Sequence, residues 1–365
     1  MPSLFTPLTA GLLELPNRIC MAPMTRGRAG SRHVPNELLV DYYAQRASAG
    51  LLITEATMVA ADGSAFVEEP GLFDDECTDG WRRVTAEVHR RGGRIAVQLW
   101  HPGRAAHSAL NAGVQPISST ARAIRNDSIR VPGLGKQPYE VPRCLATNEI
   151  PGIVKAFAEA ARRADAAGFD AVQMHAAHGY LLDQFLRDSV NDRSDGYGGS
   201  LPNRARLLLE SLDAIIGELG AGRVSVRISP LVDYNDIEDS NPGALTAYLA
   251  AEFQRRGIAF LELRHAQHSD PAEQALARLV RDHFKGALFL NGDFDRESAV
   301  EAIESGLADA ISFGRPYIAN PDLVERFAAA APLASFDPKT LYSPGARGYT
   351  DYPPLAAPQA LAGIG

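Results

Sequence analysis

Cysteine is scarce in this sequence, and its three copies, Cys20, Cys77 and Cys144, are odd in number and widely spaced. This pattern excludes a disulfide framework of the kind found in small secreted proteins. It also provides no cysteine cluster that could hold an iron–sulfur centre. We therefore interpret the three side chains as reduced thiols of a cytosolic protein.

Long apolar runs and an excess of positive charge are also missing. No stretch approaches the roughly 20 residues that cross a membrane, and "MPSLFTPLTAG" lacks the basic start and apolar core of a secretory signal. The net charge of −8 argues against a general affinity for nucleic acids or acidic membranes. We expect a cytoplasmic protein without a nucleic-acid or membrane partner. It could be a monomer or a homodimer.

The chain does contain eight short, almost continuous apolar runs, which are typical of parallel strands buried on both faces. These runs cover 19–24, 51–56, 94–100, 171–175, 224–229, 260–264, 288–292 and 310–314. Helical patterns alternate with them at 36–49, 149–167, 202–219, 244–256, 271–285, 295–306 and 320–330. Repeated strand–helix units predict an α/β fold, a (β/α)8 TIM barrel. A doubly wound sheet fits less well, because "APMTRGRAG" after the first run lacks the GxGxxG spacing.

Three segments lie outside this repeat. The stretch "PLTAGLLELPNR" carries hairpin-like turn signals before the first strand. Residues 101–147, rich in Gly, Pro and Arg, form a long insertion after the third strand, and such loops are commonly functional lids. Residues 335–365 are rich in Pro and Gly, and we expect them to pack over the barrel. We therefore interpret residues 1–365 as a single domain.

Polar side chains gather at the C-terminal ends of the predicted strands, where (β/α)8 barrels carry their working residues. The stretch "MHAAHGYLLDQFL" at the fourth strand contains His175, His178 and Tyr180. These could be metal ligands, acids and bases, a substrate clamp or structural side chains. A third metal ligand is hard to find, because the best candidates, Asp293 and His265, have no recognisable spacing. We therefore expect no metal.

The ends of strands seven and eight have the features of an anion site. Gly292 and Gly314 let the backbone approach an anion closely, and Arg315 supplies positive charge. Phosphate often binds at this place in (β/α)8 barrels. Together with Gln98 and Arg227 from strands three and five, these residues suggest a phosphorylated, hydrogen-bonding cofactor, and an isoalloxazine would fit.

With these features in place, the sequence resembles the old yellow enzyme family of FMN-dependent ene-reductases, in its threonine-type branch, nearly end to end. The resemblance is carried by "PNRICMAPMTR", "QLWHPGR", "EIPGIVKAFAEAARRADAAGFDAVQMHAAHGYLLDQFL", "DRSDGYGGSLPNRARLLLE", "VSVRISP" and "FGRPYIANPDL". It implies an oxidoreductase with non-covalent FMN and NAD(P)H as reductant. Such an enzyme reduces activated C=C bonds of enones or nitroalkenes, or nitro and nitrate ester compounds, by ping-pong hydride transfer.

The resemblance also implies roles for single residues. His175 and His178 would hold the substrate oxygen, and Tyr180 would donate the proton. The residues implied to bind the flavin are Pro23, Met24, Thr25, Ala56, Gln98, Arg227, Gly292, Asp293, Gly314 and Arg315. The residues implied to shape the substrate site are Trp100, Phe66 and Tyr342, with Arg130 as a guide for substrate or NAD(P)H.

The chain departs from the family pattern in places. Gln173 stands where related chains often carry glutamate, and the polar turn "LFLNGDF" leaves the details of phosphate binding at Asn291 and Asp293 open. His265 and His268 are extra histidines, which could alter the pocket or be solvated loop residues, and we expect the second. Two other functions stay open: a related flavin barrel that oxidises an alicyclic dienone or an amine, and a flavin-binding protein without significant turnover. The physiological substrate and the choice between NADH and NADPH do not follow from the sequence.

Overall fold

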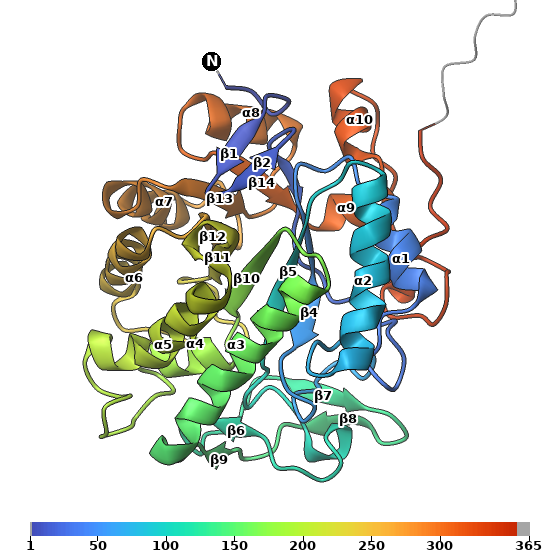
Figure 1. Cartoon of the computed structure of the whole chain (residues 1–365). Coiled ribbons are helices and arrows are strands. Elements are labelled where there is room, and N and C mark those ends of the chain that lie inside the picture. The colour runs from blue at the N-terminus through green and yellow to red at the C-terminus, as the bar shows by residue number, and fades with distance from the viewer. Residues whose placement is uncertain (1, 356–365) are drawn as a thin grey trace, which may run out of the picture.

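Eight parallel strands close into a barrel in the order β10-β11-β12-β13-β14-β3-β4-β5 (Figure 1). The structure is a computed structural model in which residues 2–355 are described, so part of the predicted C-terminal tail lies outside the described residues. The strands are β3 Ile19–Met21, β4 Leu52–Met58, β5 Ile95–Trp100, β10 Ala171–Ala176, β11 Val224–Ile228, β12 Phe260–Arg264, β13 Ala287–Asn291 and β14 Ala310–Phe313. Each lies on a predicted apolar run, and the predicted (β/α)8 barrel is confirmed.

Helices connect the strands and surround the barrel (Figure 1). The longer ones are α1 Glu37–Ala44, α2 Asp75–Arg90, α3 Ile150–Ala166, α5 Leu201–Leu219, α6 Pro242–Arg256, α7 Pro271–His283 and α8 Arg296–Glu304, and the short α10 Leu323–Ala328 follows the last strand. Two short helices, α4 Leu181–Leu186 and α9 Arg315–Ala319, begin close to strand ends. Local signals fix several starts, since the Asn36 and Asp295 side chains accept hydrogen bonds from the first turns of α1 and α8.

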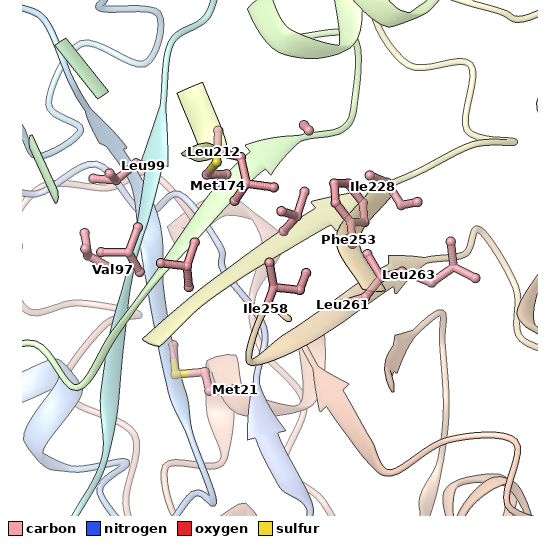
Figure 2. Packing of buried hydrophobic residues seen from close by; sticks show 14 of the residues in the cluster. Met21, Val97, Leu99, Met174, Leu212, Ile228, Phe253, Ile258, Leu261 and Leu263 are labelled. Atoms are coloured by element: carbon pink, nitrogen blue, oxygen red, sulfur yellow. The ribbon is translucent and has the colours of Figure 1, made fainter. Parts of the chain in front are cut away.

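Side chains alternate between the two faces of each barrel strand, as a pleated strand requires. The apolar outward positions pack against the surrounding helices in one buried cluster. Figure 2 shows this packing for Leu261 and Leu263 of β12, with Phe253 of α6 close by. Each such fully buried side chain contributes roughly 1.5–3 kcal/mol of hydrophobic stabilisation, which fixes the strands in register.

The inward positions change character along the barrel. Near the strand starts they are apolar, and Phe260 and Phe289 pack with Leu13 and Leu15 of the N-terminal hairpin. This hairpin consists of the antiparallel strands β1 Leu8–Ala10 and β2 Leu13–Leu15, as the turn signals predict. The next inward position on β12 is Glu262, which is fully buried. The barrel interior therefore becomes polar toward the C-terminal ends of the strands.

The insertion after β5 and the C-terminal tail both cover this polar end. The insertion contains β6 Ile117–Ser118, β7 Ser128–Val131, β8 Gly135–Pro138 and β9 Arg143–Cys144. In the tail, the carbonyls of Thr340 and Gly348 accept hydrogen bonds from Arg28 and Arg26, at 2.9 and 2.6 Å.

No helix within residues 2–355 has the length and apolar character that crossing a membrane requires.

Candidate active site

Three neighbouring cavities lie at the C-terminal ends of the barrel strands and share lining residues. The arginine cavity, of about 520 Å³, is lined by Arg227, Arg264 and Arg315. It continues through Arg227 into the histidine pocket, of about 170 Å³, which contains His175, His178 and Tyr180. Tyr180 also lines the tyrosine pocket, of about 440 Å³, together with Tyr139, Tyr234 and Tyr342.

The two histidines and the tyrosine predicted to act together do meet in the histidine pocket. The ring centroids of His175 and His178 are 5.4 Å apart, and those of His175 and Tyr180 are 5.1 Å apart. His175 comes from the inward face of β10, whereas His178 lies in the following turn with a φ of 58°. The Ser229 hydroxyl accepts the His178 N–H at 2.9 Å, and the Asn235 amide donates to its carbonyl at 2.8 Å. These bonds offset the strain of a left-handed, non-glycine residue.

The buried ion pair of Asp183 and Arg187 supports the same turn. Gly179 has a φ of 71°, and a Cβ there would come within 2.7 Å of a carbonyl oxygen, so the turn requires glycine. Its N–H donates to the Asp183 carboxylate at 3.0 Å, which in turn receives the Arg187 guanidinium at 2.7 Å. Gln184 donates to the carbonyls of Gly179 and Pro102, at 2.7 and 3.0 Å, and so links the turn to the insertion.

Burial keeps the two imidazoles neutral. It lowers the pKa of His175 well below the usual value, and the positive charge of Arg227 adds to the effect. Burial likewise lowers the pKa of His178, with further contributions from His175 and Arg227. Within the described residues, the buried Nδ1 of His175 has no hydrogen-bond partner. A neutral imidazole still carries one N–H, so both side chains can donate a hydrogen bond into the pocket.

Tyr180 keeps its proton for the same reason, because burial disfavours the charged form of a phenol as it does that of an imidazole. Its side chain packs edge-on against Trp100 at a centroid distance of 5.2 Å and is 7% exposed. Burial raises the pKa of Tyr180 well above 10, and neighbouring tyrosines such as Tyr234 reinforce this. The phenol is therefore a neutral donor throughout the physiological pH range.

Positive charge is concentrated in the arginine cavity. Arg227 donates to Asn291 Oδ1 at 2.9 Å and has a buried Nε without a partner among the described residues. Burial, and then the charge of Arg227, lowers the pKa of Arg264 to about 10, and its Nη1 is also unpartnered in the described part of the chain. Arg315 Nη1 lies 3.7 Å from Asp293 Oδ1 at the solvent-exposed edge. Such donors without protein partners are available to an anionic ligand.

Most predicted flavin-site residues line the first two cavities, but Gly292 does not. Those that do are Pro23, Met24, Thr25, Ala56, Gln98, Arg227, Asp293, Gly314 and Arg315. The Gly292 carbonyl instead accepts the His268 N–H at 2.7 Å. A Cβ at Gly292 would come within 2.6 Å of the His265 side chain, so close packing explains the glycine.

Three of the predicted substrate-site residues line a pocket, and the fourth lies behind the pocket wall. Phe66, Arg130 and Tyr342 line the tyrosine pocket. Trp100 is fully buried behind that wall, with its ring 5.9 Å from Phe66, and therefore supports the pocket instead of lining it. Tyr342 is 62% exposed at the rim.

Sequence reasoning was wrong about His265 and missed two residues of the cavities. His265 is not a solvated loop residue: it is 4% exposed, and its Nδ1 lies 3.2 Å from the Glu273 carboxylate. The His265 N–H donates to the Asn291 carbonyl and so extends the pairing of β12 with β13, while Glu273 and the turn at Gly292 pack against the side chain. Tyr234 lines all three cavities, and Arg264 lies at the C-terminal end of β12. The strand-end position of Arg264 was a usable signal, whereas Tyr234 lies in an irregular loop.

The joined cavities fit FMN. At one end, the unpartnered Nη1 of Arg264 and the exposed guanidinium of Arg315 suit a phosphate dianion. At the other end, the Gln98 amide and the Thr25 hydroxyl can each donate and accept, as the edge of an isoalloxazine requires. Across the described residues, no group of three His, Cys, Asp or Glu side chains is arranged to hold a metal ion.

The fold and the site together define a flavin-dependent oxidoreductase built on a (β/α)8 barrel. The sequence profile of the NADH:flavin oxidoreductase / NADH oxidase family matches residues 3–333. The chain therefore belongs to this family, the old yellow enzyme family, and is an enzyme that uses FMN and NAD(P)H.

Similar proteins span almost the whole chain. A probable flavin mononucleotide-dependent alkene reductase of Leishmania infantum is 46% identical over 351 residues, 95% of this chain and 96% of that protein. The 12-oxophytodienoate reductase 7 of Oryza sativa subsp. japonica is 43% identical over 379 residues, 98% of this chain and 96% of the relative. Morphinone reductase in complex with tetrahydroNAD has a TM-score of 0.94 and 43% identity, covering 98% of each chain. An old yellow enzyme homologue from Zymomonas mobilis has a TM-score of 0.93 and 44% identity, covering 97% of this chain and all (100%) of that one.

Proposed function

We propose that this enzyme reduces activated C=C bonds, as in enones and nitroalkenes, or nitro and nitrate ester groups, at the expense of NAD(P)H. The observation that carries the proposal is the histidine pocket, where two neutral imidazoles and one protonated phenol face a common space. The relatives named as an alkene reductase, 12-oxophytodienoate reductases and morphinone reductase support this substrate class.

FMN, when bound, would accept a hydride from NAD(P)H and supply it to the substrate. Thr25, Ala56 and Gln98 would contact the ring edge, with Pro23 and Met24 beside it, because they line the pocket and the cavity that joins it. Arg227 would lie near the N1–C2 region of the ring and favour negative charge there. The backbone at Asp293 and Gly314, next to that of Gly292, would hold the phosphate together with the Arg315 guanidinium. The free donor of Arg264 adds a contact that the sequence resemblance did not indicate.

His175 and His178 would donate hydrogen bonds to the carbonyl or nitro oxygen of the substrate. Their neutral state means that each needs only its one N–H for this purpose. Two donors aimed at an oxygen that gains negative charge act as an oxyanion hole, which draws electron density from the C=C bond. Tyr180 would then give its proton to the α-carbon, as a general acid.

The tyrosine pocket would hold the remainder of the substrate. Its lining is mostly apolar and aromatic, with Phe66 and Tyr342 at the wall and rim and Arg130 on strand β7. Since it opens onto the histidine pocket through Tyr180, substrate and nicotinamide would occupy the same space in turn. Ping-pong kinetics would follow. We further propose that residues 1–365 act as one domain, because tail carbonyls are bound by Arg26 and Arg28 next to the site.

Two measurements on the purified protein test this function. Anaerobic mixing with NADPH should bleach the flavin absorbance, and a protein that does not bleach with NADPH or NADH is not a reductase. Titration with a para-substituted phenol should produce a long-wavelength charge-transfer band if the two histidines hold a phenolate over the flavin. The variant His178→Ala should lose this band while it retains the flavin spectrum. A band of unchanged strength would remove His178 from the oxygen site.

A further inference from the structure

A fully buried carboxylate lies in the barrel interior, directly beneath the proposed flavin site. Glu262 is on an inward position of β12, and its Oε2 accepts a hydrogen bond from Gln173 Nε2 at 2.8 Å. Its Oε1 accepts a hydrogen bond from the Ser312 hydroxyl. Arg227 Nη1 is 3.8 Å from Oε2. The chemistry proposed above makes no use of this group.

Placing a carboxylate in a barrel interior is unfavourable by several kcal/mol unless donors and an opposite charge surround it. Here Gln173 and Ser312 each donate one hydrogen bond, and Arg227 supplies the opposite charge. These partners stabilise a carboxylate, which can only accept hydrogen bonds. An apolar side chain would fill this position at lower cost, so the carboxylate needs another explanation.

The carboxylate fixes the direction of a chain of two amides. Because the Glu262 carboxylate can only accept, Gln173 turns its NH₂ group toward it and its Oε1 away. That oxygen accepts the hydrogen bond from Gln98 Nε2 at 2.8 Å. Gln98 therefore keeps its own Oε1 and one N–H for the histidine pocket, which it lines. The pyrimidine edge of a flavin presents one N–H donor next to a carbonyl acceptor. It therefore needs one acceptor and one donor from the Gln98 amide.

We propose that Glu262 is a positioning residue for the flavin: it sets the orientation of the Gln98 amide and lowers the reduction potential by offsetting part of the positive charge of Arg227. The reduced ring carries more negative charge than the oxidised ring, so a carboxylate beneath the site disfavours reduction. The inference rests on the flavin contacts proposed above for Gln98 and Arg227.

The test is a redox titration of the holoenzyme against a reference dye. Glu262→Gln is expected to shift the equilibrium at least tenfold toward the reduced flavin. For a two-electron couple, a tenfold shift raises the midpoint potential by about 30 mV. The matched control is Asp239→Asn, which removes another buried carboxylate, bound to Arg204 at 2.6 Å and outside the three cavities. The control should keep the wild-type potential. An unchanged potential in Glu262→Gln, with FMN bound, overturns the charge role.

A second variant decides the orientation role and covers a failure of Glu262→Gln to fold. Gln173→Met keeps the carboxylate but interrupts the chain to Gln98, so FMN should bind several-fold more weakly. FMN affinity equal to that of the wild type would overturn the proposed chain of amides. Absence of a flavin spectrum from the wild-type protein would instead contradict the flavin contacts themselves. Failure of the proposed role of Glu262 and failure of the proposed flavin site are therefore distinguishable.

Discussion

The substitution Tyr180→Phe isolates the proposed proton donor. Only the hydroxyl is removed, because phenylalanine retains the ring contacts with Trp100 and His175 at centroid distances of 5.2 and 5.1 Å. Stability should therefore change little. The loss of a positioned general acid lowers a rate by about 10²–10⁴-fold, equivalent to about 2.7–5.4 kcal/mol in the barrier.

The assay is anaerobic stopped-flow of the two half-reactions. Reduction by NADPH should stay close to the wild-type rate, whereas reoxidation by 2-cyclohexenone should slow by the factor given above. Because burial raises the pKa of Tyr180 well above 10, reoxidation of the wild type should be independent of pH between pH 6 and 9 as far as Tyr180 is concerned. Unimpaired enone reduction in the variant would refute the role of the phenol.

A matched control is available in the same pocket. Tyr139 also lines the tyrosine pocket, and burial raises the pKa of its phenol to about 12. Tyr139→Phe removes a comparable hydroxyl that does not line the histidine pocket, so reoxidation at saturating enone should stay close to the wild-type rate even if enone binding weakens. A similar loss in both variants would indicate a change in substrate binding instead of lost proton donation.

Three further predictions concern the cofactor, the fold and pH. Arg264→Met should weaken FMN binding about tenfold or more by loss of a charged hydrogen bond, but leave riboflavin binding unchanged; equal losses for both ligands would contradict a phosphate contact. Arg187→Met leaves the 1% exposed Asp183 as an unpaired buried charge and should lower the free energy of unfolding by about 3–5 kcal/mol in a denaturant titration; a loss below 1 kcal/mol would contradict this. His101, with a pKa lowered to about 4 by burial, and His178 stay neutral in the fold, so the unfolded chain binds more protons below pH 6.5. The free energy of unfolding should therefore fall from pH 6.5 toward pH 4, by up to about 1.4 kcal/mol per pH unit for each group. A melting temperature that rises on acidification would refute this.

The sequence predicted the barrel well because its signals are local. Buried parallel strands need continuous apolar runs, and all eight runs became barrel strands. Strand ends then predicted where His175, Tyr180 and Arg227 would meet, since parallel strands end at one mouth. Boundaries were less certain: the helix predicted over 36–49 ends at Ala44.

The residues that sequence reasoning missed depend on contacts between distant segments. His265 is buried because Glu273 of α7 and the turn at Gly292 pack against its side chain, and no local pattern encodes these contacts. Tyr234 reaches all three cavities from an irregular loop. Trp100 was predicted at the substrate site, but only the packing of distant segments places it behind the pocket wall instead of in the lining.

The sequence by itself determined the fold class, the family and the two imidazoles and phenol that face the proposed substrate, because strand periodicity and motif spacing are properties of the linear chain. Only the tertiary structure decided which of these groups are neutral, since the pKa of His175 and that of Tyr180 depend on burial by segments far away in sequence. It also decided that Gln98, Gln173 and Glu262 form one chain of hydrogen bonds. These residues come from three different strands, and closure of the barrel brings their side chains together.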